Sequence, residues 1–289
     1  MTLDPQQLSH HYRITGELDS ATIDRFRQAI YSRYHANPRP MPWRETRDPY
    51  RILVSEIMLQ QTQVERVKTK YAEFLACFPD ISRLAAASLP DVLAVWQGLG
   101  YNRRAITLKR CAEVAVERYD GKLPATVAEL ESLPGIGPYT ARAVAAFAFG
   151  VAEPLIETNI RTLFIHCFFH DRDDVHDREL LPLVSATLDR DNPREWYYAL
   201  MDYGVAIKQQ HPNPGRRSRH HTRQSRFEGS NRQLRSRLLR EIMAHGELDA
   251  GTLTDLTGAN GEQVFSNLLD LEREGFLEKQ PGGWRVRQK

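Results

Sequence analysis

Apolar residues recur at helical spacing almost without interruption from Thr22 to Ile207, and this pattern constrains the fold more than any other feature of the sequence. Pro or Gly marks the breaks between segments, and runs of alternating polar and apolar residues are few. Residues 22–207 are therefore predicted to form one all-α domain. Within it, the segment Pro49–Val64 is apolar around most of its circumference, which is typical of a helix buried inside a larger domain.

The rest of the sequence divides into three parts with different compositions. Residues 1–21 are interpreted as an N-terminal extension, and residues 208–230 are rich in Pro, Gly, Ser, His and Arg, which predicts a linker or an ordered extended arm. Residues 231–289 contain three short amphipathic segments and then two strand patterns around Pro281-Gly282-Gly283. Three helices and a hairpin predict a C-terminal winged-helix-like domain.

Cysteine usage and the chain start exclude several protein classes. Cys77, Cys111 and Cys167 are widely spaced and odd in number, so they cannot build a disulfide framework or a four-thiolate metal cluster. The N-terminus has no apolar signal-like segment, and no run approaches the ~18 apolar residues of a membrane span. We expect no membrane association, no bound metal, and a reducing, cytoplasmic location.

Glu56 lies within the apolar run from Ile52 to Leu59. In a central helix its carboxyl group would be desolvated, which would raise its pKa toward neutral and suit it to general acid catalysis. The alternative is a glutamate that escapes to solvent or pairs with a cation. Gln60 and Gln61 follow with amide groups that can hydrogen-bond base edges, although they could equally form a solvated helix end.

The segment 133–140, LPGIGPYT, joins two predicted helices through a tight turn. Glycines allow a partner to approach the backbone closely, and backbone N–H groups at a helix start bind phosphate. This predicts a sequence-independent clamp on a nucleic-acid backbone, although Gly and Pro occur at any interhelical turn. The residues expected to take part are Gly135, Gly137, Tyr139 and Thr140.

Glu157 and Asn159 stand at the predicted start of a helix about twenty residues after this turn. A carboxylate there often serves only as a helix cap. Together with Glu56, however, it would supply the two carboxyl groups that cleavage of a glycosidic bond uses, one acid for the leaving group and one anion facing an oxocarbenium-like sugar.

Positive charge is concentrated between Lys208 and Arg240, with ten Lys or Arg residues and a single acid, although the whole chain has a net charge of +2. A solvated charge run needs no partner, but beside a candidate phosphate clamp the nucleic-acid interpretation is preferable. The histidines of this arm have no acidic or thiol partner at ligand spacing, so a metal site is not expected. The predicted phosphate contacts are Arg216, Arg217, Arg219 and Arg223.

These residues resemble the helix-hairpin-helix DNA glycosylases, and within them the MutY-type adenine DNA glycosylases. The resemblance covers about Thr22 to Ile207. It rests on Pro42-Trp43, on Pro49-Tyr50, on the segment from Ser55 to Val64, on Trp96-Gln97-Gly98-Leu99-Gly100-Tyr101, on the LPGIGPYTA turn and on Ala199-Leu200-Met201-Asp202-Tyr203-Gly204.

The resemblance implies a two-lobed helical fold that binds double-stranded DNA as a monomer and extrudes a mismatched or damaged base. Glu56 would protonate the departing purine, Glu157 would stabilise the sugar cation, and Gln60, Gln61 and Tyr101 would contact DNA. Tyr139 occupies the position where lyase-type relatives carry a Schiff-base lysine, so base removal with little strand cleavage is expected.

Three differences from the family pattern leave alternatives open. Glu157 replaces the usual aspartate, the iron–sulfur loop after Ile207 has no cysteine, and a winged-helix-like segment stands where the MutT-like domain is expected. An adenine mispaired with guanine or 8-oxoguanine is the leading substrate. A thymine/uracil mismatch DNA glycosylase and a DNA-binding protein with a decayed catalytic site are the alternatives, and no iron–sulfur cofactor is expected.

Overall fold

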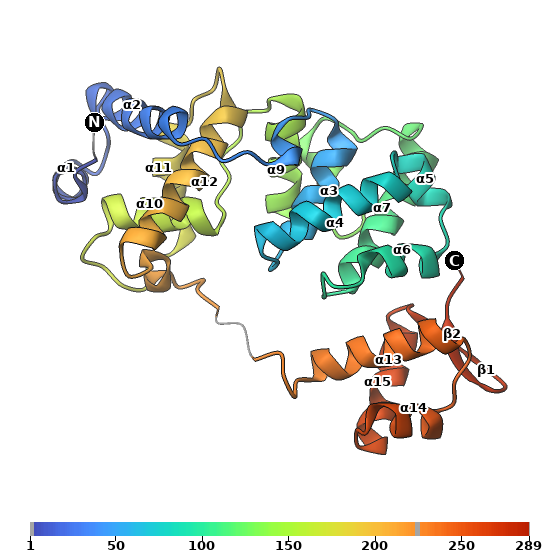
Figure 1. Cartoon of the computed structure of the whole chain (residues 1–289). Coiled ribbons are helices and arrows are strands. Elements are labelled where there is room, and N and C mark those ends of the chain that lie inside the picture. Colours follow the sequence, from blue (N-terminus) through green and yellow to red (C-terminus); the bar gives the residue numbers. More distant parts are fainter. Residues whose placement is uncertain (1–2, 223–225, 289) are drawn as a thin grey trace. The chain divides into compact units, whose positions relative to one another are not determined.

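The computed structural model describes residues 3–222 and 226–288 and is almost entirely helical (Figure 1). These residues form fifteen α-helices, two 3-10 helices and one two-stranded sheet, which confirms the predicted all-α class. The chain divides into two compact units, each built from separate stretches of sequence. Among the described residues, no helix combines the length and the apolar character needed to cross a membrane.

The first unit comprises residues 1–52, 125–131 and 136–223. Its core lies where the rings of Phe26, Phe164 and Trp196 meet, with centroids 5.7 to 6.1 Å apart for Phe26 and its two partners. Its elements are α1 (Pro5–Thr15), α2 (Ser20–Ala36), η1 (Pro42–Arg44), the first turn of α3 (Pro49–Leu59), α8 (Val127–Glu131), α9 (Pro138–Phe149), α10 (Thr158–Phe168), α11 (Asp177–Thr187), α12 (Pro193–Gln210) and η2 (Pro214–Arg217).

The second unit comprises residues 53–124, 132–135 and 224–289. Phe74 and Trp96 are fully buried and meet edge to face at 5.8 Å, which places the core between α4 and α6. Its first elements are the remainder of α3, then α4 (Val64–Cys77), α5 (Ile81–Ala86), α6 (Leu89–Trp96) and α7 (Arg103–Tyr119).

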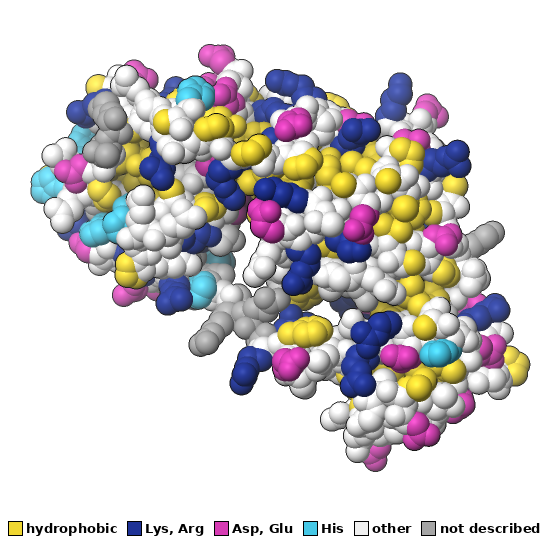
Figure 2. Space-filling model, in the orientation of Figure 1, with side chains coloured by type: hydrophobic (Ala, Val, Ile, Leu, Met, Phe, Trp, Pro, Cys, Tyr) yellow, Lys and Arg dark blue, Asp and Glu magenta, His cyan; other side chains and the backbone are white. Residues whose placement is uncertain are grey.

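The C-terminal part of this unit has the predicted winged-helix elements. They are α13 (Asn231–His245), α14 (Ala250–Thr257), α15 (Gly261–Arg273), β1 (Leu277–Gln280) and β2 (Gly283–Val286). The strands pair antiparallel, with Leu277 opposite Val286. Asn260 caps α15, accepting hydrogen bonds from the backbone N–H groups of Glu262 and Gln263. Acidic side chains recur over the visible face of this part in Figure 2.

The N-terminal extension contains a helix that the sequence did not predict. Asp4 caps α1, and the Ser9 hydroxyl donates a hydrogen bond to the carbonyl of Phe168, 159 positions away. Tyr12 adds edge-to-face contacts with Phe168 and Phe169. Because these contacts are made to α10 and the residue after it, the polar sequence of α1 alone gives little indication of them.

Candidate active site

Glu56 is buried in the second unit, on the part of α3 that is apolar on all sides. Its residue exposure is 7%, whereas Leu53, Val54 and Ile57 are exposed by 1% or less. The helix begins where the Asp48 carboxylate accepts hydrogen bonds from the backbone N–H groups of the first turn. The interpretation that Glu56 escapes to solvent is therefore wrong.

The amide side chains that follow Glu56 lie on a turn. Helix α3 ends at Leu59, earlier than the predicted Val64, and α4 begins at Val64. Gln61 adopts a left-handed backbone conformation with φ of 54° and is exposed, while Gln60 is half-buried. The two amides are thus presented by a tight turn between helices instead of by a helix end.

The predicted hairpin is present between α8 and α9. Gly135 has φ of 70°, and a Cβ there would lie 1.9 Å from Cγ2 of Thr107, so only glycine fits. Gly137 caps α9, is exposed, and has open space where a side chain would be. Tyr139 is half-buried in the first turn of α9, and Thr140 is buried. This turn leaves room for a phosphate chain to approach the backbone at Gly137.

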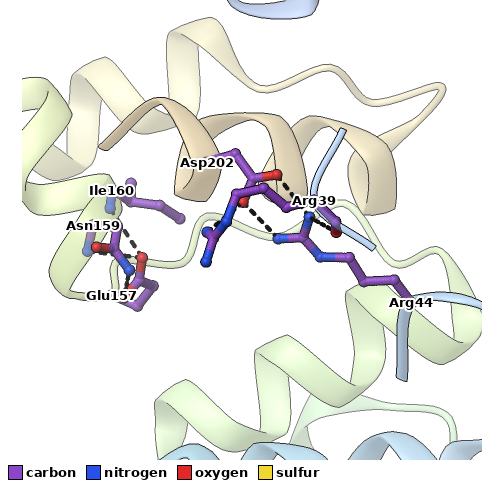
Figure 3. A network of polar contacts seen from close by, with 6 residues as sticks. All are labelled: Arg39, Arg44, Glu157, Asn159, Ile160 and Asp202. Carbon is purple, nitrogen blue, oxygen red and sulfur yellow. Dashed lines mark hydrogen bonds and ion pairs between the residues drawn. The ribbon is translucent and has the colours of Figure 1, made fainter. Parts of the chain in front are cut away.

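Glu157 lies at the start of α10 in the first unit, and its carboxylate caps that helix (Figure 3). One oxygen accepts hydrogen bonds from the backbone N–H groups of Asn159 and Ile160, at 2.7 and 3.1 Å. The other accepts one from the side-chain amide of Asn159 at 3.2 Å. Desolvation raises the pKa of Glu157, and these hydrogen bonds and the charge of Lys208 act in the opposite direction.

A second carboxylate in the same unit holds two arginines. Asp202 on α12 is 7% exposed and accepts hydrogen bonds from Arg39 at 2.8 Å and from both terminal nitrogens of Arg44 at 2.7 and 2.9 Å (Figure 3). The Arg44 guanidinium also lies 4.5 Å from the centroid of the Tyr198 ring. Sequence reasoning included Asp202 only as part of a motif and missed both arginines, whose one signal was their position beside Pro42-Trp43.

Gly204 lets α12 approach the capped end of α10. A Cβ at this position would lie 2.1 Å from the backbone carbonyl oxygen of Asn159. Helix α12 therefore packs directly against the turn that carries Glu157 and Asn159. The structure brings these two predicted site residues together, whereas Glu56 belongs to the other compact unit.

The basic arm begins as an ordered segment packed on α10. Arg217 donates hydrogen bonds from Nη1 to the carbonyls of Phe169 and His170, just past the end of that helix. The Arg217 guanidinium therefore binds backbone carbonyls of the protein, whereas the sequence predicted that it contacts phosphate. Arg216 is exposed, and Arg219 is exposed with Asp174 at 3.9 Å. Arg223 lies outside the described residues.

The cysteines of this chain do not fit an iron–sulfur cluster. Cys77 is exposed on α4, whereas Cys111 on α7 and Cys167 on α10 are buried. Burial raises the pKa of Cys111 to about 12 and also raises that of Cys167, which opposes formation of a thiolate ligand. Residues 3–222 and 226–288 contain no group of three or more acidic, His or Cys side chains arranged to hold a metal ion.

Known proteins resemble this chain in sequence and in structure. Residues 54–200 match the family model described as HhH-GPD superfamily base excision DNA repair protein. The chain is 36% identical over 277 residues to an adenine DNA glycosylase of Mycolicibacterium smegmatis, covering 88% of this chain and 93% of that protein. It is 34% identical over 190 residues to a thymine/uracil-DNA glycosylase of Pyrobaculum aerophilum, covering 63% and 83% of the two chains.

Among solved structures, a thermostable thymine-DNA glycosylase superimposes with a TM-score of 0.59 and 27% identity, covering 64% of this chain and 87% of that one. The family model spans about half of the chain and includes Glu56, the hairpin and Glu157. The chain therefore belongs to the HhH-GPD superfamily of base excision DNA repair proteins.

Proposed function

We propose that this protein is a monofunctional DNA glycosylase that extrudes a mismatched adenine from double-stranded DNA and hydrolyses its N-glycosidic bond. The observation that carries the proposal is the burial of Glu56 within an apolar helix. We propose that this carboxyl group donates a proton to the departing purine. The name of the Mycolicibacterium smegmatis relative supports adenine as the base.

Glu157 is proposed to stabilise the cationic sugar that forms as the base leaves, and to orient the attacking water. In the family that this chain resembles, an aspartate is usual at this position, and a glutamate is one methylene longer. In this structure the extra length is taken up because the carboxylate folds back to cap its own helix through three hydrogen bonds. Capping fixes the anion close to the backbone, so the longer side chain still presents a defined negative charge.

The expected product is an abasic site with an intact strand. Tyr139 has no amine that could form a Schiff base with the sugar, so the sugar–phosphate chain is not cleaved by that route. Contacts to DNA are proposed for Gln60, Gln61 and Tyr101, for the hairpin residues Gly135, Gly137, Tyr139 and Thr140, and for Arg216 and Arg219 of the arm. The protein is proposed to act as a monomer in the cytoplasm, at the nucleoid.

The test uses duplexes with adenine opposite guanine, adenine opposite 8-oxoguanine, and thymine or uracil opposite guanine, each treated with protein and then with alkali. We expect strand breaks at adenine after alkali treatment and no breaks when alkali is omitted. Glu56→Gln should lower the single-turnover rate by at least ~100-fold while duplex binding persists, because a general acid contributes 10² to 10⁴ in rate. Binding without release of any base would contradict the proposal and favour a DNA-binding protein.

A second candidate is a thymine/uracil mismatch glycosylase. It is favoured by the 34% identity to the Pyrobaculum aerophilum enzyme and by the fold of the thermostable thymine-DNA glycosylase. The chemistry assigned to Glu56 and Glu157 is the same. Release of thymine or uracil, with adenine left intact in the same set of duplexes, would establish this candidate.

The proposal includes no iron–sulfur cluster. Protein contacts hold the segment after α12, since Arg217 caps the end of α10 and a Cβ on Gly215 would lie 2.7 Å from the hydroxyl of Thr162. Arg217→Met should lower the free energy of unfolding by about 1–2 kcal/mol, whereas the same change at exposed Arg216 should alter it by less than about 0.5 kcal/mol. Iron in the purified protein, or loss of stability with a chelator, would contradict this part.

A further inference from the structure

One arginine outside the proposed catalytic residues holds the end of α3. The guanidinium of Arg104, from the first turn of α7, is half-buried between α3 and the segment before α7. Most of its partners are backbone carbonyls. Nη1 lies 2.9 Å from the carbonyls of Ile57 and Met58 and 2.6 Å from that of Gln60, while Nη2 lies 2.9 Å from the carbonyl of Gly100 and 3.1 Å from the Thr62 hydroxyl.

These contacts lie at the end of α3. The last carbonyls of a helix have no N–H partner within it and carry the negative end of its dipole, so a cation placed there is favourable. Arg104 spans the last turn of α3 and continues to the carbonyl of Gln60 and the side chain of Thr62. Burial lowers the pKa of Arg104 to about 10, which still leaves it charged at neutral pH.

The same contacts stabilise an unfavourable backbone conformation. Gln61 has φ of 54°, which costs a side-chain-bearing residue about 1 kcal/mol or more. Arg104 binds the residue before Gln61 and the residue after it, so the left-handed turn is fixed from both sides. A lysine could supply the charge but not the planar fork that reaches several acceptors at once.

The C-terminal part of the second unit supports this arginine. The guanidinium of Arg104 lies 5.5 Å from the centroid of the Tyr101 ring, and that of Arg232, on α13, lies 5.3 Å from the same ring. Arg232 also donates a hydrogen bond to the Tyr101 hydroxyl. A second link joins α7 and α13, because Arg103 and Arg235 each form an ion pair with Glu274 at 2.6 Å.

We propose that Arg104 is a positioning residue that presets the Gln60–Gln61 turn for its contact with DNA, and that the winged-helix-like segment braces it through Arg232 and Tyr101. The inference rests on the proposed function, because it assigns this turn to DNA binding. It gives the C-terminal segment a role within the chain: Arg232 restrains Tyr101, Tyr101 packs on Arg104, and Arg104 fixes the turn.

The experiment compares Arg104→Lys and Arg232→Met with Arg103→Lys in the full chain. Arg103 is the matched control, since it neighbours Arg104 but is 71% exposed, and a lysine there can keep its ion pair with Glu274. The first readout is hydrogen–deuterium exchange of the peptide that covers residues 57–66. The second is the fluorescence of 2-aminopurine at the target position of a duplex, which rises when the base leaves the stack, together with the single-turnover rate of adenine release.

Arg104→Lys should speed exchange of the turn peptide by about tenfold or more, with peptides of α9 and α10 unchanged. It should also reduce the 2-aminopurine signal and lower the rate by about tenfold or more, because small misplacements at a site are costly. Arg232→Met should change the same peptide and lower the rate by about threefold, and Arg103→Lys should do neither. Arg232→Met leaves the buried fork in place, so it tests the brace even if Arg104→Lys fails to fold.

Exchange that stays at the wild-type rate in the turn peptide, or rises equally in every peptide, would overturn the positioning role. An unchanged turn in Arg232→Met would overturn the brace. Failure of the proposed function has a different signature, because the wild-type protein would then release no base while the exchange measurements still report on Arg104.

Discussion

Replacing Gly204 with alanine tests the role of the close approach between α12 and the start of α10. A Cβ at Gly204 would lie 2.1 Å from the carbonyl oxygen of Asn159 and 2.7 Å from its carbonyl carbon. Carbon and oxygen atoms that are not bonded stay about 3.3 Å apart or more. The first turn of α10 must therefore move by about 1 Å in Gly204→Ala, because the obstacle is backbone and no flexible side chain can yield.

Two effects of opposite sign set the magnitude. Alanine in place of glycine inside a helix is favourable by about 1 kcal/mol. Forcing extra volume into a packed interior costs about 1–3 kcal/mol, and a clash with backbone belongs at the upper end of that range. We therefore expect Gly204→Ala to lower the free energy of unfolding by about 1–2 kcal/mol. Because the displaced turn carries Glu157, a shift of about 1 Å should also lower the rate by up to ~100-fold.

Urea unfolding and single-turnover release of adenine measure the two effects. Gly261→Ala, at the first residue of α15, is the matched control, since a Cβ there meets Thr254 only at 3.8 Å; the change should leave the rate unaltered and should not lower the free energy of unfolding. The reasoning is refuted if Gly204→Ala is as stable as the wild-type protein, or more stable, and keeps its rate within threefold. Helix propensity alone would then account for the result.

Three further predictions concern charge and pH. Arg216→Ala combined with Arg219→Ala should reduce the slope of log affinity against log salt by about two, because each phosphate contact contributes about one. Fluorescence anisotropy measures the affinity, and an unchanged slope would exclude these two arginines from the DNA contact. Desolvation raises the pKa of Glu157, and the charge of Lys208 lowers it. Because Lys208→Met removes this charge, it should move the acid limb of the pH–rate profile to higher pH. A shift to lower pH would contradict a role for ionised Glu157. Burial lowers the pKa of His166 to about 4. The free energy of unfolding of the wild-type protein should therefore fall as the pH drops from about 6.5 toward 4, by up to about 2 kcal/mol after allowance for partial solvent exposure. In urea unfolding at each pH, His166→Phe should lack this loss.

The sequence predicted a helix buried on all sides around Glu56 but not the end of that helix. Periodicity showed that α3 is apolar on all sides, and burial on all sides follows from that directly. Nothing local distinguishes residues 60–63 from helix, since glutamine is a good helix former. The last carbonyls of α3 accept hydrogen bonds from Arg104, more than forty positions away, and a contact of that separation leaves no periodic signal.

The basic arm illustrates a second limit of sequence reasoning. Counting charges located a cationic segment correctly, but charge alone cannot say whether a guanidinium faces solvent or backbone carbonyls. Arg216 and Arg217 are neighbours of the same type, yet the first is exposed and the second caps α10. Helix α1 was missed for a related reason, because its contacts with α10 and Phe169 leave no pattern in its polar sequence.

The Asp202-Tyr203-Gly204 segment of α12 fixes two neighbouring segments of the chain. Asp202 binds Arg39 and Arg44 from the connection before α3, while Gly204 admits the backbone of Asn159 at the start of α10. Residues two apart on a helix face different directions, so one turn of α12 fixes two neighbouring segments at once. Substitution at either position should therefore affect activity through the placement of Glu157 and of the arginines, although neither Asp202 nor Gly204 is assigned a part in the chemistry.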